Sequence, residues 1–180
     1  MSFYTKSYLE SLTSQYGDST VFNESVRAAR KSYSFDIFLS HSYNDKKYIK
    51  GLFYELTKMG FRVYVDWIVD SHLDRSNITK GTVNHIRNRM KQSKSLIYAT
   101  SDNASKSKWM PWELGYMDGY TSHCSILPIT DYEDQTFSDQ EFLSVYPYIK
   151  KDALRNNYSK NNLRIYESTF SYKTMGEWLM

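Results

Sequence analysis

The stretch SKWMPWELGYMDG places two tryptophans and a proline close to one glutamate, Glu113. A proline has no amide hydrogen and is best tolerated in the first turn of a helix, so Pro111 predicts a helix that begins between Ser107 and Met110. Glu113 then lies near the positive end of the helix dipole, which favours its ionised form. Trp109, four residues earlier, lies on the same face of that helix. The pattern therefore pairs an anionic carboxylate with a flat aromatic ring.

This pair suits a substrate with a planar ring and a developing positive charge, and nicotinamide leaving a ribose fits that description. Hydrolysis of an ordinary glycoside needs an acid that protonates the leaving group and a second carboxylate. A pyridinium ring leaves as a neutral molecule and needs no acid, so one glutamate that stabilises the oxocarbenium-like sugar is enough. The alternative is structural: Glu113 would be a solvated partner of the helix dipole, and Trp109 and Trp112 would be packing residues.

Signatures of other chemistries are absent from the sequence. It contains no glycine-rich GxGxxG or GxxxxGK[ST] loop and no GxSxG nucleophile motif. No histidine or cysteine lies at the spacing of metal ligands in the set His41, His72, His85, His123 and Cys124. We therefore expect neither a metal nor a cofactor.

The elements that position the Glu113 helix alternate between strand and helix patterns. Phe35, Ile37 and Leu39 alternate in a stretch that Phe38 makes apolar on both faces, as a buried parallel strand requires. Further strands are expected at 61–67, 95–100, 125–129 and 163–166, and further helices around 49–59, 83–90 and 172–179. This alternation predicts a parallel sheet that is covered by helices on both faces.

Ligands of open parallel sheets bind beyond the carboxyl ends of the strands, near the point where the strand order reverses. In this sequence those ends carry polar residues at 40–42, 66–67, 101–102 and 130–131. The helix that carries Glu113 begins just past the third of them. Glu113 is therefore expected at the functional edge of the sheet.

Residues 1–33 differ from the pattern that follows. A helical stripe covers Tyr8–Tyr16, and a second short helical pattern begins at Asn23. We predict an N-terminal helical extension over 1–33, either packed on the domain or used for assembly. One domain over 34–180 follows it.

Composition bounds the class of protein. The chain has 180 residues, with 23 Lys and Arg against 20 Asp and Glu and no long basic block, so we expect no nucleic-acid partner. A single cysteine indicates a reducing compartment. The N-terminus lacks the apolar segment of a signal peptide, and no apolar run approaches the roughly 20 residues of a membrane span. The sequence therefore predicts a cytoplasmic protein without a membrane partner.

Three motifs give the chain a resemblance to Toll/interleukin receptor (TIR) domains. SFDIFLSHSYND resembles the first box of that family, a strand of the form DxFxSH followed by a polar turn and an acidic residue. FRVYVDW and the polar loop after it resemble the second strand and the BB loop. SKSKWMPWEL resembles the family pattern SxWxxxEL. The motifs extend from about Phe35 to Ile129.

The resemblance implies a flavodoxin-like, three-layer α/β fold with a five-stranded parallel sheet. It also implies that Glu113 is the catalytic residue of NAD+ cleavage and that Trp109 lines the pocket for nicotinamide and its ribose. The implied substrate-binding set is His41, Ser42, Asp66, Ser107 and Trp109. NAD+ is then the substrate, with no separate cofactor and no metal.

Within the family, the chain is similar to the TIR subunits of Thoeris anti-phage defence systems. Such proteins convert NAD+ into ADP-ribose derivatives, often cyclic, that activate a separate effector protein. The resemblance implies an NAD+ glycohydrolase or cyclase that associates with itself through TIR–TIR contacts and responds to a phage-derived trigger. Two alternatives stay open: a non-catalytic interaction module that assembles through its BB loop, and a nucleoside-processing transferase of the same layered fold. Linear and cyclic products are both compatible with the sequence.

Overall fold

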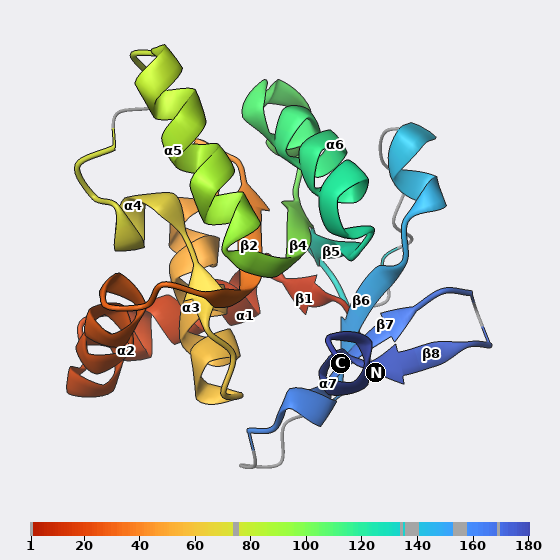
Figure 1. The fold of residues 1–180 in the computed structure, drawn as a ribbon. Helices are drawn as coiled ribbons and strands as arrows, with labels where there is room; N and C mark the ends of the chain where they lie inside the picture. The colour runs from red at the N-terminus through yellow and green to blue at the C-terminus, as the bar shows by residue number, and fades with distance from the viewer. Residues whose placement is uncertain (1, 74–75, 134, 136–140, 153–157, 169) are drawn as a thin grey trace.

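The computed structural model describes residues 2–73, 76–133, 135, 141–152, 158–168 and 170–180 (Figure 1). In this part of the chain, an eight-stranded sheet forms the centre of the molecule. Its order is β3 (Val63–Tyr64), β2 (Phe35–His41), β4 (Ser93–Thr100), β5 (Cys124–Thr130), β6 (Tyr148–Lys151), β7 (Leu163–Tyr166) and β8 (Tyr172–Thr174), and β1 (Tyr4–Thr5) also pairs with β5. Neighbouring strands from β3 to β6 pair in parallel, and so do β1 and β5. The pair of β6 with β7 and the pair of β7 with β8 are antiparallel.

The three longest strands, β2, β4 and β5, lie next to one another in the middle of the sheet. Every residue of β2 and β5 is buried, and so is all of β4 except Lys94. Both faces of these strands are apolar because helices cover both of them, as the stretch from Phe35 to Leu39 predicts. Parallel pairing brings the carboxyl ends of the three strands to one edge.

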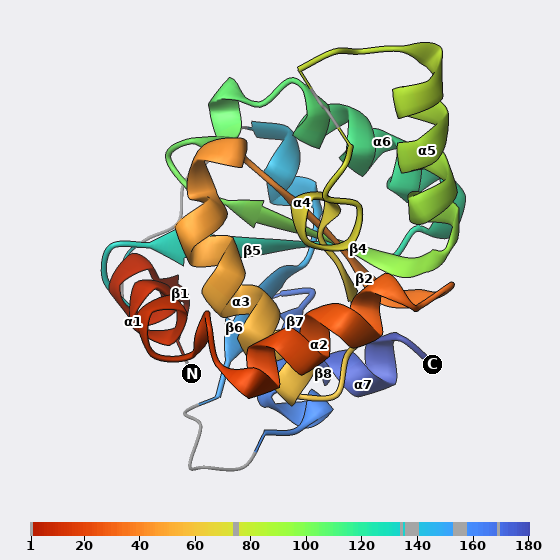
Figure 2. The same cartoon turned by 90° about the vertical axis from the view of Figure 1, so that its left-hand side faces the viewer.

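Helices form a layer on each side of this sheet. α5 (Lys80–Lys91) and α6 (Trp109–Thr121) cover one face, and α3 (Lys46–Lys58) covers the other, with α1 (Lys6–Tyr16) and α2 (Thr20–Arg30) packed against it (Figures 1 and 2). The short helices are α4 (Asp66–Val69), α7 (Met175–Trp178), η1 (Tyr43–Asp45), η2 (Ala104–Lys106), η3 (Glu141–Val145) and η4 (Lys160–Asn162). α6 begins two residues before Pro111, within the predicted limits.

The N-terminal segment is part of this architecture. β1 adds a parallel pair to β5, and α1 crosses α3 so closely that a Cβ atom at Gly51 would overlap the backbone oxygen of Leu9. Aromatic side chains join the same elements, since the rings of Tyr16 and Tyr54 stack with centroids 4.5 Å apart. The two expected helices are present. The division of the chain at residue 33 stays a prediction.

The predicted α/β class, with a mostly parallel sheet between helical layers, is confirmed. The sheet has three strands beyond the five expected, β1, β6 and β8, and these have only two to four residues each, too few for a recognisable alternation. The strand expected at 61–67 is the two-residue β3. The expected helix at 172–179 is instead the short strand β8 followed by α7. Within the described residues, no helix combines the length and the apolar character that a membrane span requires.

Candidate active site

A cavity of about 550 Å³ opens at the carboxyl edge of the sheet, within the range of roughly 300–1,000 Å³ that is typical of small-molecule sites. β2, the turn after it, α4, the loop after α4 and the start of α6 all contribute to its wall. The lining residues are His41, Tyr43, Lys46, Asp66, Trp67, Ser71, Leu73, Ser76, Ser107 and Trp109. The cavity therefore forms where the rule for open parallel sheets places a site.

His41, the last residue of β2, is held on both sides of its ring. Its Nδ1 lies 2.9 Å from the carbonyl oxygen of Leu39, and the indole N–H of Trp67 donates a hydrogen bond of 2.9 Å to Nε2. An Nε2 atom that accepts and an Nδ1–H group that donates describe the neutral imidazole. Asp66 places Oδ1 3.6 Å from the same Nε2 atom. The hydrogen bonds fix His41 and Trp67 as one rigid part of the wall.

Glu113 lies in the second turn of α6 and is fully buried. The hydroxyl group of Ser40 donates a hydrogen bond of 2.5 Å to its Oε2 atom. Successive side chains of a strand point to opposite faces, so the connection between Glu113 and the cavity wall runs through α6, which also carries Trp109. Glu113 itself is not among the lining residues. The carboxylate is thus shielded from solvent and separated from the cavity by the lining residues.

The start of α6 forms the opposite wall. Ser107 lines the cavity and accepts a hydrogen bond of 3.3 Å at its Oγ atom from the amide of Met110, which satisfies one free amide of the first helical turn. Trp109 lines the cavity one turn before Glu113, and its ring meets that of Trp112 edge to face, with centroids 5.5 Å apart. The aromatic wall and the carboxylate therefore share one helix face, as the spacing predicts.

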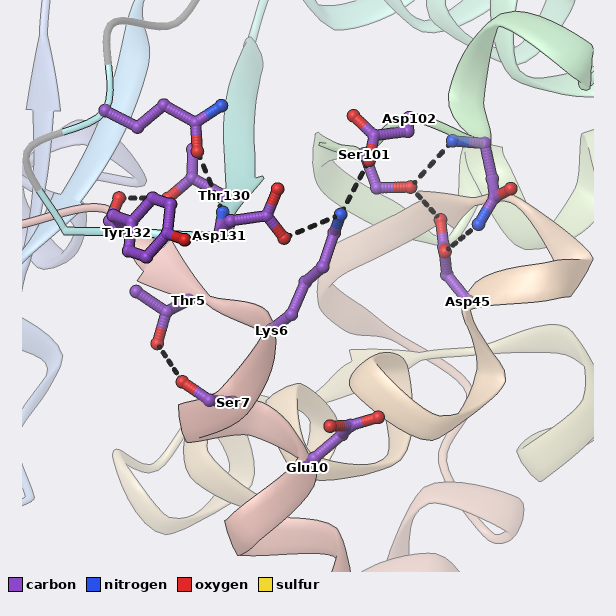
Figure 3. A network of polar contacts seen from close by, with 12 residues as sticks. Thr5, Lys6, Ser7, Glu10, Asp45, Ser101, Asp102, Thr130, Asp131 and Tyr132 are labelled. Carbon is purple, nitrogen blue, oxygen red and sulfur yellow. Dashed lines mark hydrogen bonds and ion pairs between the residues drawn. The ribbon is translucent and has the colours of Figure 1, made fainter.

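A polar network braces the loops at this edge (Figure 3). Asp45 is fully buried and accepts hydrogen bonds of 2.5 Å from the Ser101 hydroxyl and 2.8 Å from the Asn103 amide. These bonds join the start of α3 to the loop that leads to α6. Lys6, at the start of α1, pairs with Asp102 at 2.6 Å and with Asp131 at 3.0 Å, and these pairs raise its pKa. Through Lys6, the N-terminal segment therefore forms ion pairs with the residues that follow β4 and β5.

Asp70 anchors the loop that follows α4. Its carboxylate accepts hydrogen bonds from Nε and Nη2 of Arg89 at 2.8 and 2.7 Å, and from the Tyr64 hydroxyl at 2.9 Å, while Nε2 of His85 lies 2.8 Å away. Burial acts to raise the pKa of Asp70, but the bonds from Arg89, His85 and Tyr64 outweigh it and hold that pKa at about 2. The base of the loop, which carries Ser71 and Leu73 into the cavity, is thereby fixed to α5.

The structure brings most of the sequence-predicted site residues together. His41, Asp66, Ser107 and Trp109 line one cavity, whereas Ser42 is buried at the start of η1 and does not line it, and Glu113 lies beneath it. Sequence reasoning placed Ser40 and Trp67 only among the strand ends, and it did not single out the wall residues Tyr43, Lys46, Ser71, Leu73 and Ser76. The rule that strand ends carry the site points to Ser40 and Trp67, which directly adjoin predicted residues. No group of three or more possible metal ligands occurs in the described ranges.

A family model and two known proteins match the chain, and they agree with one another. A family model described as TIR domain matches residues 37–162. The Bacillus cereus (strain MSX-D12) protein named "Probable 3' cyclic ADP-D-ribose synthase ThsB'" is 40% identical over 161 residues, which cover 88% of this chain and 82% of that protein. The Cytobacillus dafuensis protein named "Putative cyclic ADP-D-ribose synthase TIR2" is 35% identical over 83 residues, which cover 46% of this chain and 22% of that protein.

Proposed function

The chain belongs to the TIR domain family, and on that premise we propose that it cleaves the bond between nicotinamide and ribose in NAD+. The product is an ADP-ribose derivative that acts as a signal in anti-phage immunity. One observation carries the proposal: the carboxylate of Glu113 lies one helical turn from Trp109 in the cavity wall and is oriented by the Ser40 hydroxyl. The name of the Bacillus cereus relative supports the same reaction class.

In the proposed reaction, Trp109 positions the nicotinamide ring and Glu113 stabilises the sugar. The bond between the ribose carbon and the ring nitrogen breaks, and its electron pair goes to the nitrogen, so a neutral nicotinamide leaves without an acid. The positive charge that develops on the ribose carbon faces the carboxylate of Glu113. Electrostatic stabilisation of this kind is strong in a dry site because the effective dielectric constant is low.

The finer proposal is that the product is cyclic. The ribose carbon is then captured by an oxygen or nitrogen atom of the same ADP-ribose, which loses its proton, rather than by water. The complete burial of Glu113 supports capture within the molecule, because a reacting carbon beside this carboxylate meets little water. The name of the Bacillus cereus relative, which specifies a cyclic product, supports it as well.

The burial of Glu113 also supports a role for assembly. NAD+ reaches the carboxylate only if the wall between the cavity and Glu113 opens. We propose that self-association through TIR–TIR contacts, promoted by a phage-derived trigger, provides this opening, and that the product then acts on a separate effector protein. The same burial is also compatible with the second candidate function, a non-catalytic interaction module, because a carboxylate that stays buried never contacts a substrate.

Incubation of the concentrated protein with NAD+ separates these functions. We expect free nicotinamide and a second product lighter than ADP-ribose by one water molecule, resolved by chromatography and mass spectrometry. ADP-ribose as the sole second product would contradict the cyclic assignment alone. If no nicotinamide appears, even in the presence of lysate from phage-infected cells, the interaction module is the correct function.

A further inference from the structure

Among the cavity-lining residues that the structure describes, Lys46 is the one lysine or arginine. Its ammonium group lies 3.9 Å from the centre of the Tyr43 ring and 5.3 Å from that of the Trp67 ring. Aromatic faces attract a cation, but they do not neutralise it. The cavity therefore holds a positive charge between two aromatic rings.

No residue that the structure describes forms an ion pair with Lys46, although its neighbours on α3 are paired. Lys47 pairs with Glu10, and Lys50 pairs with Asp18 at 3.1 Å. The carboxylate of the adjacent residue, Asp45, accepts hydrogen bonds from Ser101 and Asn103 instead. Lys46 thus differs from the other lysines at the start of its helix: it faces a cavity and has no anionic partner within the described part of the chain.

The exposed fractions of the side chains in β2 and in the turn after it distinguish a buried end of the site from an exposed end. Ser40 and the Glu113 carboxylate that it contacts are at most 1% exposed, His41 is 7% exposed, and Tyr43 is 74% exposed. The segment from Ser40 to Tyr43 therefore begins beside the buried Glu113 carboxylate and ends at a solvent-exposed side chain of the cavity wall. Lys46, which is partly buried beside Tyr43, lies toward the outer end.

We propose that Lys46 is the binding residue for the pyrophosphate of the substrate. This inference rests on the proposed function, in which the ribose that bears nicotinamide lies at Glu113. A dinucleotide whose reactive end lies there extends outward through its two phosphates, which carry two negative charges. An ammonium group binds phosphate oxygens through charge-assisted hydrogen bonds. Lys46 supplies that group on the side of the cavity toward which the dinucleotide extends from Glu113.

The test is equilibrium binding of ADP-ribose, which contains the pyrophosphate but no nicotinamide, to the wild type and to three variants. Lys46→Gln removes the charge, Lys46→Arg keeps it, and Lys58→Gln removes the same charge from the exposed last turn of the same helix. We expect Lys46→Gln to raise the Kd by about tenfold or more, and Lys46→Arg and Lys58→Gln to stay within about threefold of wild type. Added salt weakens wild-type binding more than Lys46→Gln binding.

The outcomes separate this inference from the proposed function. Unchanged ADP-ribose binding by Lys46→Gln overturns it, and so does an equal loss in Lys46→Arg, because the effect would then come from packing rather than charge. A wild type that does not bind ADP-ribose overturns it as well. Binding that depends on Lys46 in a protein that releases no nicotinamide would uphold the pyrophosphate site and reject only the catalytic function.

Discussion

The hydroxyl group of Ser40 lies 2.5 Å from Oε2 of Glu113, and this hydrogen bond joins two residues that are 73 positions apart in the sequence. It connects the carboxyl end of β2 to α6, so the strand that ends in the cavity wall also orients the proposed catalytic carboxylate. Both side chains are buried, which makes the bond inaccessible to water. In the proposed reaction, Ser40 is a positioning residue for Glu113.

Removal of this hydroxyl tests the positioning role. We expect Ser40→Ala to lower kcat for nicotinamide release by about tenfold to a hundredfold, because a hydrogen bond to a charged group contributes roughly 1.5–3 kcal/mol. The matched control is Ser95→Ala, which removes another buried hydroxyl, one that donates at 2.8 Å to the carbonyl of Asp36. Steady-state kinetics should show little change in kcat for the control. Equal losses in both variants would mean that Ser40 acts through stability alone.

The contact between α1 and α3 gives a prediction about the N-terminal segment. Gly51→Ala places a methyl group against the backbone oxygen of Leu9, and we expect it to lower the free energy of unfolding by about 1–3 kcal/mol. Gly115→Ala, in α6, meets no atom within 4 Å and should instead raise stability by about 0.5–1 kcal/mol. Urea unfolding measures both variants. If Gly51→Ala were as stable as Gly115→Ala, α1 would not be packed on α3 in solution.

The carboxylate of Asp70 predicts how stability depends on pH. Its pKa of about 2 in the folded state lies below the ordinary value of 3.8, so Asp70 binds a proton less readily when the protein is folded. The stabilisation is therefore complete above about pH 4 and is lost as the pH falls from there through about 2. After allowance for solvent screening it amounts to between about 1 and 2 kcal/mol.

Comparison with Asp70→Asn isolates this contribution. At pH 6 the variant should be less stable than the wild type, and the gap should narrow as the pH falls through about 2, because protonation makes Asp70 neutral like asparagine. Urea unfolding at a series of pH values provides the measurement. A gap that stays constant would show that the loss comes from altered packing or geometry and not from the charge of Asp70.

The longest elements could be predicted from the sequence because their patterns are local. The apolar residues Phe35, Ile37, Phe38 and Leu39 predict β2, and Pro111 predicts the start of α6. The short strands β1, β6 and β8 could not be predicted, because they owe their conformation to pairing with other segments. β1 is the clearest case: its two residues become a strand only because they lie beside Ile129 and Thr130.

The same distinction applies to the site. Residues at strand ends, such as His41 and Asp66, were predictable because parallel strands all end at one edge. The contact between Ser40 and Glu113 was not, since it depends on how α6 lies across β2. Lys46 was not singled out either, because its significance comes from its place in the cavity wall and from the lack of an ion pair with any described residue, whereas its neighbours on α3 are paired.

The central claim is that Glu113 performs the cleavage, and nicotinamide release by Glu113→Gln tests it most directly. Glutamine is nearly isosteric and can still accept the hydrogen bond from Ser40, so the melting temperature should stay close to that of the wild type. With the negative charge removed, we predict that nicotinamide release from NAD+ falls by about a thousandfold or more. A folded Glu113→Gln protein that released nicotinamide at the wild-type rate would contradict the claim.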